Sequence, residues 1–332
     1  MTRTIERTAY GGMRTVTLET ESLSVDVLPD KGADIVAVRP RDSENILFEA
    51  PHNWQSLDGP YRPSTYDGTA WMDHYPGGWQ DCLPLAGVGG SAQGATYGLH
   101  GETPFMGWDI EFPNQPSAVA ALDCFVELVR YPVRVKRRME LQGSEIRIEW
   151  DVENESECSL PVVWLQHIAF GEPLLSPESV IELPESLVTV DNEPQGESEL
   201  IPGEQFKWPV STDGVDLSAI SGPNSRIHDL SYIHTLSDGT YTVKNPSADL
   251  AVTVAFDTDV FDSLWCWRSY GGYTDSPFFG REYVLGLEPA TGWPAANIPE
   301  SQGEDGTGTL LTLGPKETLS TWLTLDVSSP SN

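Results

Sequence analysis

Residues 146–153 read IRIEWDVE, and apolar and charged side chains alternate along them without a break. Because successive side chains of a β-strand point to opposite faces, this pattern buries one face of a strand and exposes the other to water. The same period of two recurs at residues 23–27, 133–136, 250–256 and 323–327. Antiparallel sheets with one solvated face typically carry such sequences. The repeated pattern therefore predicts an all-β protein.

The arrangement of breakers along the chain supports the same class. The 26 prolines and 30 glycines interrupt the sequence too often for long helices. No internal repeat occurs, and no low-complexity linker divides the chain before residue 300. Segment 171–240 is rich in loops and prolines. We therefore expect one domain over residues 1–332, a sandwich of antiparallel sheets with few or no long helices and with the loop-rich segment 171–240 inside it.

The net charge is extreme. Fifty acidic residues against nineteen Lys and Arg leave a formal charge of −31 at pH 7. In dilute buffer such self-repulsion destabilises the compact state, whereas at about 1 M salt the screening length falls to about 3 Å. The composition thus indicates a halophilic protein of a salty cytoplasm. It also argues against nucleic-acid and anionic-membrane partners, which require basic surfaces.

Targeting and redox signals point to the same compartment. The first seven residues read MTRTIER and lack the apolar core of a signal peptide. No apolar run approaches the roughly 18 residues of a membrane-spanning helix. Cys82, Cys124, Cys158 and Cys266 form no CxxC pair and are predicted to be reduced, mostly buried thiols, with a chemical role left open only for Cys82. We expect a soluble cytoplasmic monomer or homodimer.

The stretch 75–84, YPGGWQDCLP, combines glycines with an aromatic ring and polar side chains. Glycine allows close backbone approach to a ligand, and Trp79 offers a flat apolar face with a donor at its edge. Sugar C–H groups pack on such rings, while sugar hydroxyls need partners such as Gln80 and Asp81. The alternative is an ordinary turn with a core tryptophan.

Two histidines lie in contexts that suit proton transfer. His100 lies within YGLHGE, residues 97–102, where Glu102 could orient it or bind a hydroxyl. His167 lies in the apolar stretch 164–173, whose aromatic residues would keep its ring largely neutral. Histidine has an ordinary pKa of about 6.5 and exchanges protons near neutral pH. The alternatives are a turn histidine satisfied by the backbone for His100 and a satisfied core histidine for His167.

Glu288 ends the apolar run YVLGLE, residues 283–288. A carboxylate at that position should be partly desolvated, which raises its pKa and makes it a useful base. The alternative is a strand-end glutamate that points into water. In the neighbouring aromatic stretch, Trp265 and Trp267 are predicted to share one face of a strand, where one of them stacks on a sugar ring or both belong to the core.

The order of these motifs resembles the aldose 1-epimerase (galactose mutarotase) superfamily. Gly-Gly-Trp at 77–79, His-Gly at 100–101, Trp-x-x-His at 164–167 and Leu-Glu-Pro at 287–289 follow one another, within a resemblance that extends from about residue 20 to residue 327. The resemblance implies a galactose mutarotase-like β-supersandwich. It also implies an isomerase that interconverts the α and β anomers of a small-molecule sugar without cofactor or metal.

The resemblance assigns roles to three residues. Glu288 takes the proton from the C1 hydroxyl, His167 donates a proton to the ring oxygen, and His100 binds and polarises near that oxygen. One proton removed and another delivered suffice to open a hemiacetal, a step that such catalysis accelerates by about 10²–10⁴-fold. The substrate-binding residues expected around them are Trp79, Gln80, Asp81, Glu102, Trp267 and Arg62.

The sequence departs from the family pattern in places that concern the substrate. Residues 167–170 read His-Ile-Ala-Phe where mutarotases carry His-Pro-Tyr-Phe, and Arg62 is the only nearby candidate for a hydroxyl-binding arginine. The hydroxyl-binding aspartate of the family has no clear counterpart, and Asp81 or Asp262 could serve.

Three alternatives stay open. One is a carbohydrate-binding protein of the same fold without catalysis, although two histidines and a glutamate together favour an enzyme. Another is a sugar-phosphate mutarotase, for which Arg62 and Arg268 supply few cations. The third is a metal site formed by His74, His100, Glu102 and His167. The spacing of these ligands matches no known metal-binding motif.

Overall fold

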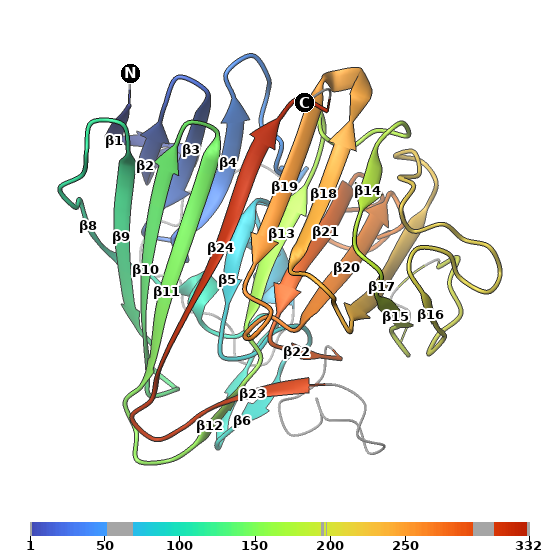
Figure 1. Cartoon of the computed structure of the whole chain (residues 1–332). Helices are drawn as coiled ribbons and strands as arrows, with labels where there is room; N and C mark the ends of the chain where they lie inside the picture. The colour runs from blue at the N-terminus through green and yellow to red at the C-terminus, as the bar shows by residue number, and fades with distance from the viewer. Residues whose placement is uncertain (1, 52–68, 194–195, 197, 295–308, 331–332) are drawn as a thin grey trace.

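The structure is a computed structural model that describes residues 2–51, 69–193, 196, 198–294 and 309–330. Two large antiparallel sheets lie face to face, with the eight-stranded sheet in front of the eleven-stranded sheet in Figure 1. Two smaller sheets lie below them in that view. The all-β prediction is therefore confirmed, and so is the sandwich of antiparallel sheets.

The larger sheet has eleven strands. In their order across the sheet they are β1 (Arg3–Ala9), β2 (Met13–Glu19), β3 (Leu23–Leu28), β4 (Asp34–Pro40), β5 (Trp79–Cys82), β13 (Leu165–Phe170), β21 (Tyr283–Ala290), β20 (Ser263–Tyr270), β17 (Ile227–His234), β15 (Leu187–Val190) and β16 (Gln205–Lys207).

The second sheet has eight strands. In their order across the sheet they are β14 (Val180–Glu182), β18 (Thr240–Asn245), β19 (Leu250–Phe256), β24 (Thr318–Ser328), β11 (Glu145–Asn154), β10 (Val133–Gln142), β9 (Ala120–Glu127) and β8 (Asp109–Glu111).

The remaining elements are short. A three-stranded sheet is formed by β12 (Leu160–Val162), β23 (Thr309–Leu313) and β22 (Gly292–Trp293), and a hairpin by β6 (Gly90–Ala92) and β7 (Ala95–Tyr97). The described residues hold one α-helix, α1 (Thr69–Asp73), and the 3₁₀ turns η1 (Tyr10–Gly12), η2 (Thr103–Phe105) and η3 (Pro246–Ala248). No helix in the part of the chain that the structure describes is long and apolar enough to cross a membrane.

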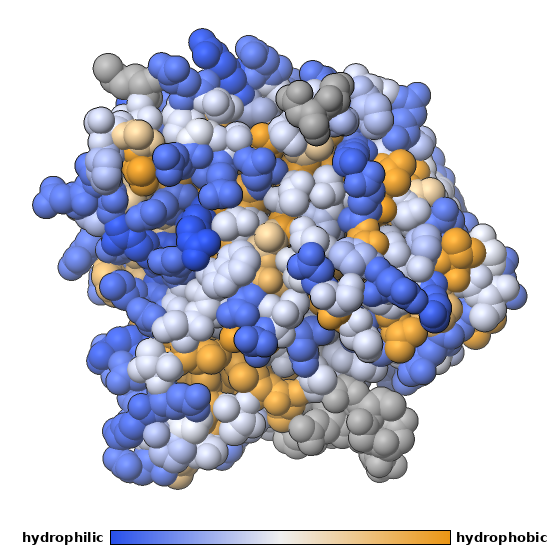
Figure 2. All heavy atoms as spheres, viewed as in Figure 1, coloured by the Kyte–Doolittle hydropathy of each residue, from blue (hydrophilic) through white to orange (hydrophobic). Residues whose placement is uncertain are grey.

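The alternating sequence pattern explains the second sheet. Residues 146–153 lie in β11, where Ile146, Ile148, Trp150 and Val152 are buried and the charged residues between them are exposed or half-buried. Side chains on a strand alternate between faces, so the buried set packs against the larger sheet. The outer face, which carries the charged set, is dominated by hydrophilic residues in Figure 2.

The core lies between the two large sheets. Phe170 of β13 contacts Tyr241 of β18, with 6.4 Å between ring centroids, and the Tyr241 hydroxyl donates to the Leu287 carbonyl of β21 at 2.8 Å. The strands within segment 171–240 lie at the edges of the two large sheets. β14 is an edge strand of the smaller sheet, and β17, β15 and β16 are the last three strands at one end of the larger sheet. Cys82, Cys124 and Cys266 are buried, Cys158 is exposed, and all four are free thiols.

Candidate active site

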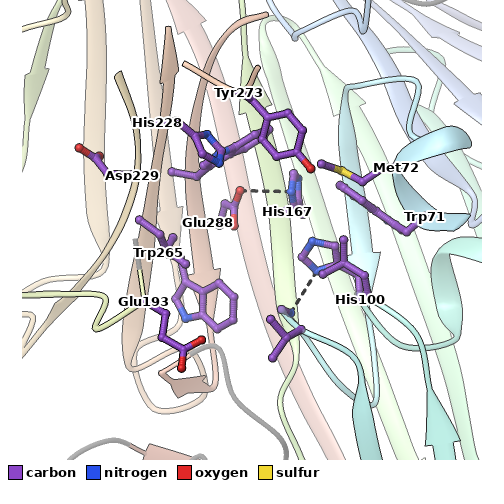
Figure 3. A pocket seen from close by; sticks show the side chains of 15 residues that line it. Trp71, Met72, His100, His167, Glu193, His228, Asp229, Trp265, Tyr273 and Glu288 are labelled. Atoms are coloured by element: carbon purple, nitrogen blue, oxygen red, sulfur yellow. Dashed lines mark hydrogen bonds and ion pairs between the residues drawn. The ribbon is translucent and has the colours of Figure 1, made fainter. Parts of the chain in front are cut away.

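A pocket lies on the face of the larger sheet that is turned away from the smaller sheet. Phe170 points to the smaller sheet, and because side chains alternate along a strand, His167 points the other way. The space inside the pocket is about 700 Å³, including the part that is open to solvent. The described residues that line it are Trp71, Met72, Gly87, Val88, Leu99, His100, His167, Glu193, His228, Asp229, Leu230, Trp265, Trp267, Tyr273 and Glu288 (Figure 3).

Strand pairing places Glu288 opposite His167. The register between β13 and β21 pairs Leu165 with Ala290 and Ala169 with Gly286, so the central residues of the two segments face each other. Glu288 Oε1 lies 3.4 Å from His167 Nε2 (Figure 3). That distance is within ion-pair range, although the geometry does not make a hydrogen bond, and no other described residue bonds this oxygen.

Gly286 provides the room that the Glu288 carboxyl group occupies. A Cβ atom added at Gly286 would lie 2.2 Å from Glu288 Oε1 and 3.2 Å from the Cβ of Trp267. Residues two apart on a strand share a face, so any side chain at this position would displace the carboxyl group. The Gly-Leu-Glu sequence is therefore a local requirement of the pair.

Burial sets the protonation of the pair. Glu288 and His167 are 2% and 3% exposed. Desolvation disfavours the charged form of each group, so it raises the pKa of Glu288 well above its ordinary value and lowers the pKa of His167 to about 4. Above about pH 4, where His167 loses its proton, the pair therefore carries one proton, which burial favours on Glu288. A site with one proton between two facing groups is suited to giving and taking protons.

His100 lies beside the pair with a defined orientation. It adopts a left-handed backbone conformation, with φ of 61°, which is uncommon for a residue other than glycine. Its ring centroid lies 5.0 Å from that of His167. The backbone N–H of Gly87 donates to His100 Nδ1 at 3.2 Å, so in the neutral ring the proton resides on Nε2. Burial lowers the pKa of His100 well below its ordinary value, and the ring is a neutral N–H donor at pH 7.

Trp71 forms one wall and is fixed by a chain of hydrogen bonds. Its ring centroid lies 4.3 Å from that of His100 and 5.3 Å from that of His167. The indole N–H donates to Gln80 Oε1 at 2.9 Å, and the Gln80 amide donates to Asp34 at 2.6 Å. Lys31 Nζ lies 2.5 Å from the same Asp34 oxygen. Gln80, which the sequence suggested as a sugar ligand, is thus occupied in orienting Trp71.

The neighbours of Gln80 also lie away from the pocket. Trp79 is buried, and its indole N–H donates to Gln166 at 2.9 Å. The Asp81 carboxylate is buried and accepts the indole N–H of Trp150 at 2.7 Å and the Gln166 amide at 2.9 Å. β5 lies inside the larger sheet between β4 and β13, which explains why these side chains are enclosed.

Two other expected ligands also have partners elsewhere. Glu102 accepts hydrogen bonds from the backbone N–H groups of Val129 and Arg130, at 2.7 and 3.2 Å, and so stabilises the loop that contains these two residues. Asp262 accepts the Thr309 hydroxyl at 3.0 Å. Arg62 lies outside the described residues.

Trp267, in contrast, lines the pocket as an aromatic platform. It is half-buried, and its ring centroid lies 5.7 Å from that of His167. Trp265 lines the pocket as well, as expected for two residues on one face of β20, but it is only 2% exposed, and its indole N–H donates to the Gly292 carbonyl at 2.9 Å. Trp267 is therefore the better placed of the two to stack on a ring.

Several pocket residues have no local sequence signal. Trp71, His228 and Tyr273 come from three separate segments and meet only through the fold. β17 is buried along nearly its whole length, so its sequence does not indicate that His228 faces the pocket. Asp229 also belongs to the lining, but its carboxylate points away from Glu288 in Figure 3 and is paired with Arg268, at 2.7 Å.

The described lining contains no lysine or arginine. Arg268, the nearest candidate, is 2% exposed and is bound to Asp229 through two nitrogen atoms. Within the described residues, no three His, Cys, Asp or Glu side chains come close enough together to hold a metal ion. The alternative set His74, His100, Glu102 and His167 is therefore not assembled as a metal site.

Comparison with known protein families assigns the chain to one of them. Residues 10–327 match the family described as a domain of unknown function, DUF4432, and the protein belongs to that family. A search of curated proteins finds no match.

Solved structures share the fold. A "putative aldose 1-epimerase" from Klebsiella pneumoniae is 16% identical with a TM-score of 0.75, over 98% of this chain and 83% of its own. A galactose mutarotase-like protein from Clostridium acetobutylicum is 14% identical with a TM-score of 0.67, over 98% of each chain. A galactose mutarotase related enzyme from Lactobacillus acidophilus is 14% identical with a TM-score of 0.62, over 95% and 97%. The chain thus has the galactose mutarotase-like fold, as the sequence motifs predicted.

Proposed function

We propose that this protein is an aldose 1-epimerase that interconverts the α and β anomers of an uncharged sugar. The observation that carries the proposal is the pair of Glu288 and His167, which face each other at 3.4 Å in a buried pocket beside the N–H group of His100. The fold that the chain shares with mutarotase-like proteins supports a sugar as substrate.

Ring opening uses the pair as base and acid. Burial favours the proton of the pair on Glu288, so the reaction begins with transfer of that proton to His167. The Glu288 carboxylate then takes the proton of the C1 hydroxyl while the protonated His167 ring donates its proton to the ring oxygen. The bond between C1 and the ring oxygen breaks, and the C1 oxygen becomes the aldehyde carbonyl. Rotation about the C1–C2 bond exposes the other face, and reclosure runs both transfers in reverse. The pair begins with one proton and ends with one, so the reaction needs no external acid or base.

The other pocket residues support this role. The Nε2–H group of His100 donates to the ring oxygen and stabilises the charge that develops there. Trp267 supplies a face for the apolar side of the sugar ring. The absence of Lys and Arg from the described lining favours an uncharged sugar over a sugar phosphate, which would need cationic partners.

The variant Glu288→Gln tests the proposal. The amide fills the same space but cannot take a proton, so we expect anomerisation to fall by about 10²–10⁴-fold while sugar binding is retained. Exchange between the anomers is measured by magnetisation-transfer NMR, and binding by titration calorimetry. Glu111→Gln, an exposed change on β8, is the matched control and should keep the wild-type rate.

Two results would contradict the assignment. A folded Glu288→Gln protein with the wild-type rate would remove Glu288 as the base. A wild-type protein that binds sugars but does not accelerate their exchange would instead be a carbohydrate-binding protein of this fold.

A further inference from the structure

His228 is a pocket histidine that the proposed proton transfers do not use. It lies on β17 directly opposite Ser269 of β20, and its ring Nδ1 is 2.9 Å from Ser269 Oγ. The side chain is 4% exposed and reaches the pocket above Glu288 in Figure 3. Its ring stands edge-on to that of Tyr273, with 4.8 Å between centroids.

A relay behind His228 fixes where its ring proton resides. The Ser269 hydroxyl donates to Glu282 Oε1 at 2.9 Å, and the backbone N–H of Tyr273 donates to the same oxygen at 2.7 Å. A hydroxyl group can donate only one hydrogen bond, and Ser269 donates it to the Glu282 carboxylate. Ser269 Oγ must therefore accept its other hydrogen bond from His228 Nδ1–H. In the neutral ring, Nε2 then carries a lone pair and no proton.

His100 and His228, the two pocket histidines beside the His167–Glu288 pair, thus have opposite hydrogen-bonding roles. Gly87 N–H binds Nδ1 of His100 and leaves Nε2–H as a donor, whereas Ser269 binds Nδ1–H of His228 and leaves Nε2 as an acceptor. Nε2 of His228 makes no hydrogen bond to any described residue and is not among the fully buried polar atoms. It is therefore an acceptor without a partner, on a residue that lines the pocket.

We propose that His228 is a specificity-determining residue whose Nε2 accepts a hydrogen bond from one hydroxyl group of the sugar, and that Glu282, acting through Ser269, is the positioning residue that holds it in that form. The inference rests on the proposed function for its substrate class. The pocket then selects sugars that carry a hydroxyl at this place over analogues that lack it, because the acceptor would be left without a partner.

The ring tautomer can be measured without any sugar. Nitrogen-15 NMR of the ring distinguishes a proton on Nδ1 from one on Nε2, and His228 should show the proton on Nδ1. Ser269→Ala removes the partner of Nδ1, so the proton should move to Nε2, the form that free histidine prefers. Ser231→Ala is the matched control, since Ser231 is as buried as Ser269 and lies on β17, the strand of His228, but does not line the pocket, and it should leave the spectrum unchanged.

Specificity is then measured by binding in the Glu288→Gln background, so that turnover plays no part. The probes are D-glucose, D-galactose and their 2-, 3-, 4- and 6-deoxy analogues. One deoxy position should raise the dissociation constant about tenfold, the usual effect of one lost hydrogen bond. Ser269→Ala should reduce that discrimination, because a proton on Nε2 turns the acceptor into a donor and the sugar hydroxyl loses the bond in which it donates, although its oxygen can still accept from Nε2–H. Ser269→Thr keeps the hydroxyl and should restore it.

Three results would overturn the inference: a proton on Nε2 of wild-type His228, a Ser269→Ala protein with unchanged tautomer and deoxy discrimination, or no binding of any probe sugar. Failure of the proposed function looks different. A protein that binds sugars with the expected discrimination but does not interconvert anomers would retain the role of His228 and lose that of the catalytic pair.

Discussion

At the scale of single residues, three pocket histidines differ in where they hold their protons, and each difference has a structural cause. A backbone N–H group fixes His100 as a donor, and a serine hydroxyl fixes His228 as an acceptor. His167 has no described hydrogen-bond partner at Nδ1 and lies against Glu288, with which it shares one proton. Because burial disfavours charge on every one of these rings, local partners decide which nitrogen is protonated.

The shared proton predicts an unusual pH profile. The pair gains a second proton below about pH 4, where His167 titrates, and loses its last proton as the pH rises through the raised pKa of Glu288. Activity should therefore show an acid limb near pH 4 and none at the ordinary histidine pKa, and it should fall as the pH rises through the raised pKa of Glu288. The measurement is kcat/KM against pH. An acid limb centred near 6.5, the ordinary value for histidine, would contradict the shared proton.

Sequence reasoning found part of this site. His100, His167, Glu288 and Trp267 each stood in a motif, and the structure brings all four to one pocket. Whether they act as the resemblance implies stays a prediction. Trp79, Gln80 and Asp81 were expected to bind the sugar but do not line the pocket. A Gly-Gly-Trp sequence indicates where a backbone can approach a ligand closely, but it does not indicate which face of the strand meets the ligand. The proposed role of His228 depends on Ser269 and Glu282. Strand register pairs His228 with Ser269, and Glu282, just before β21, reaches Ser269 only through the fold.

At the scale of elements, the central strands of the larger sheet position the pair. β13, β21 and β20 lie side by side, and their register places His167, Glu288 and Trp267 on one face. The sequence predicted several strands correctly, because a half-solvated strand shows a period of two, as residues 146–153 do in β11. β13 and β21 are buried on both faces, so their periodicity is hidden, and their sequence cannot indicate which residues face the pocket.

Gly286→Ala tests the importance of this geometry. The new Cβ would lie 2.2 Å from Glu288 Oε1 and 3.2 Å from Trp267, so the carboxyl group must move away from His167. We expect activity to fall at least about 100-fold, since a displacement of about 1 Å costs that much, with the cooperative unfolding transition retained. Activity and circular dichroism are measured on the same preparation.

Gly107→Ala is the matched control for that variant. Its added Cβ would meet only ordinary contacts, at 3.8 Å from Asp30, and it lies outside the pocket. Wild-type activity in both glycine variants would show that the observed placement of the Glu288 carboxyl group is not needed for catalysis.

At the scale of the whole molecule, the net charge of −31 governs the conditions under which the fold is stable. The outer face of the smaller sheet is dominated by hydrophilic residues (Figure 2). The excess of acidic residues over the whole chain makes like charges repel one another until salt screens them. From this composition we propose that the protein functions at high salt concentration. We also propose that residues 1–332 unfold as a single domain, since apolar contacts join the two large sheets.

Salt should therefore stabilise the protein strongly. Between 0.1 and 2 M KCl we expect the melting temperature to rise by on the order of 10 °C, with most of the gain below about 1 M, where the screening length falls steeply. Differential scanning calorimetry measures the rise, and a single transition is expected at each salt concentration. A melting temperature independent of salt would contradict the electrostatic argument, and two separate transitions would contradict the single domain.

The central claim is that the pocket catalyses anomer interconversion, and polarimetry tests it most directly. Freshly dissolved α-D-glucose and α-D-galactose are followed to equilibrium in 2 M KCl, with and without the purified protein, at several protein concentrations. We predict that the optical rotation decays faster in proportion to protein concentration for at least one sugar, and that Glu288→Gln loses this acceleration. A folded protein that binds these sugars and leaves both decay rates at their uncatalysed values would contradict the claim.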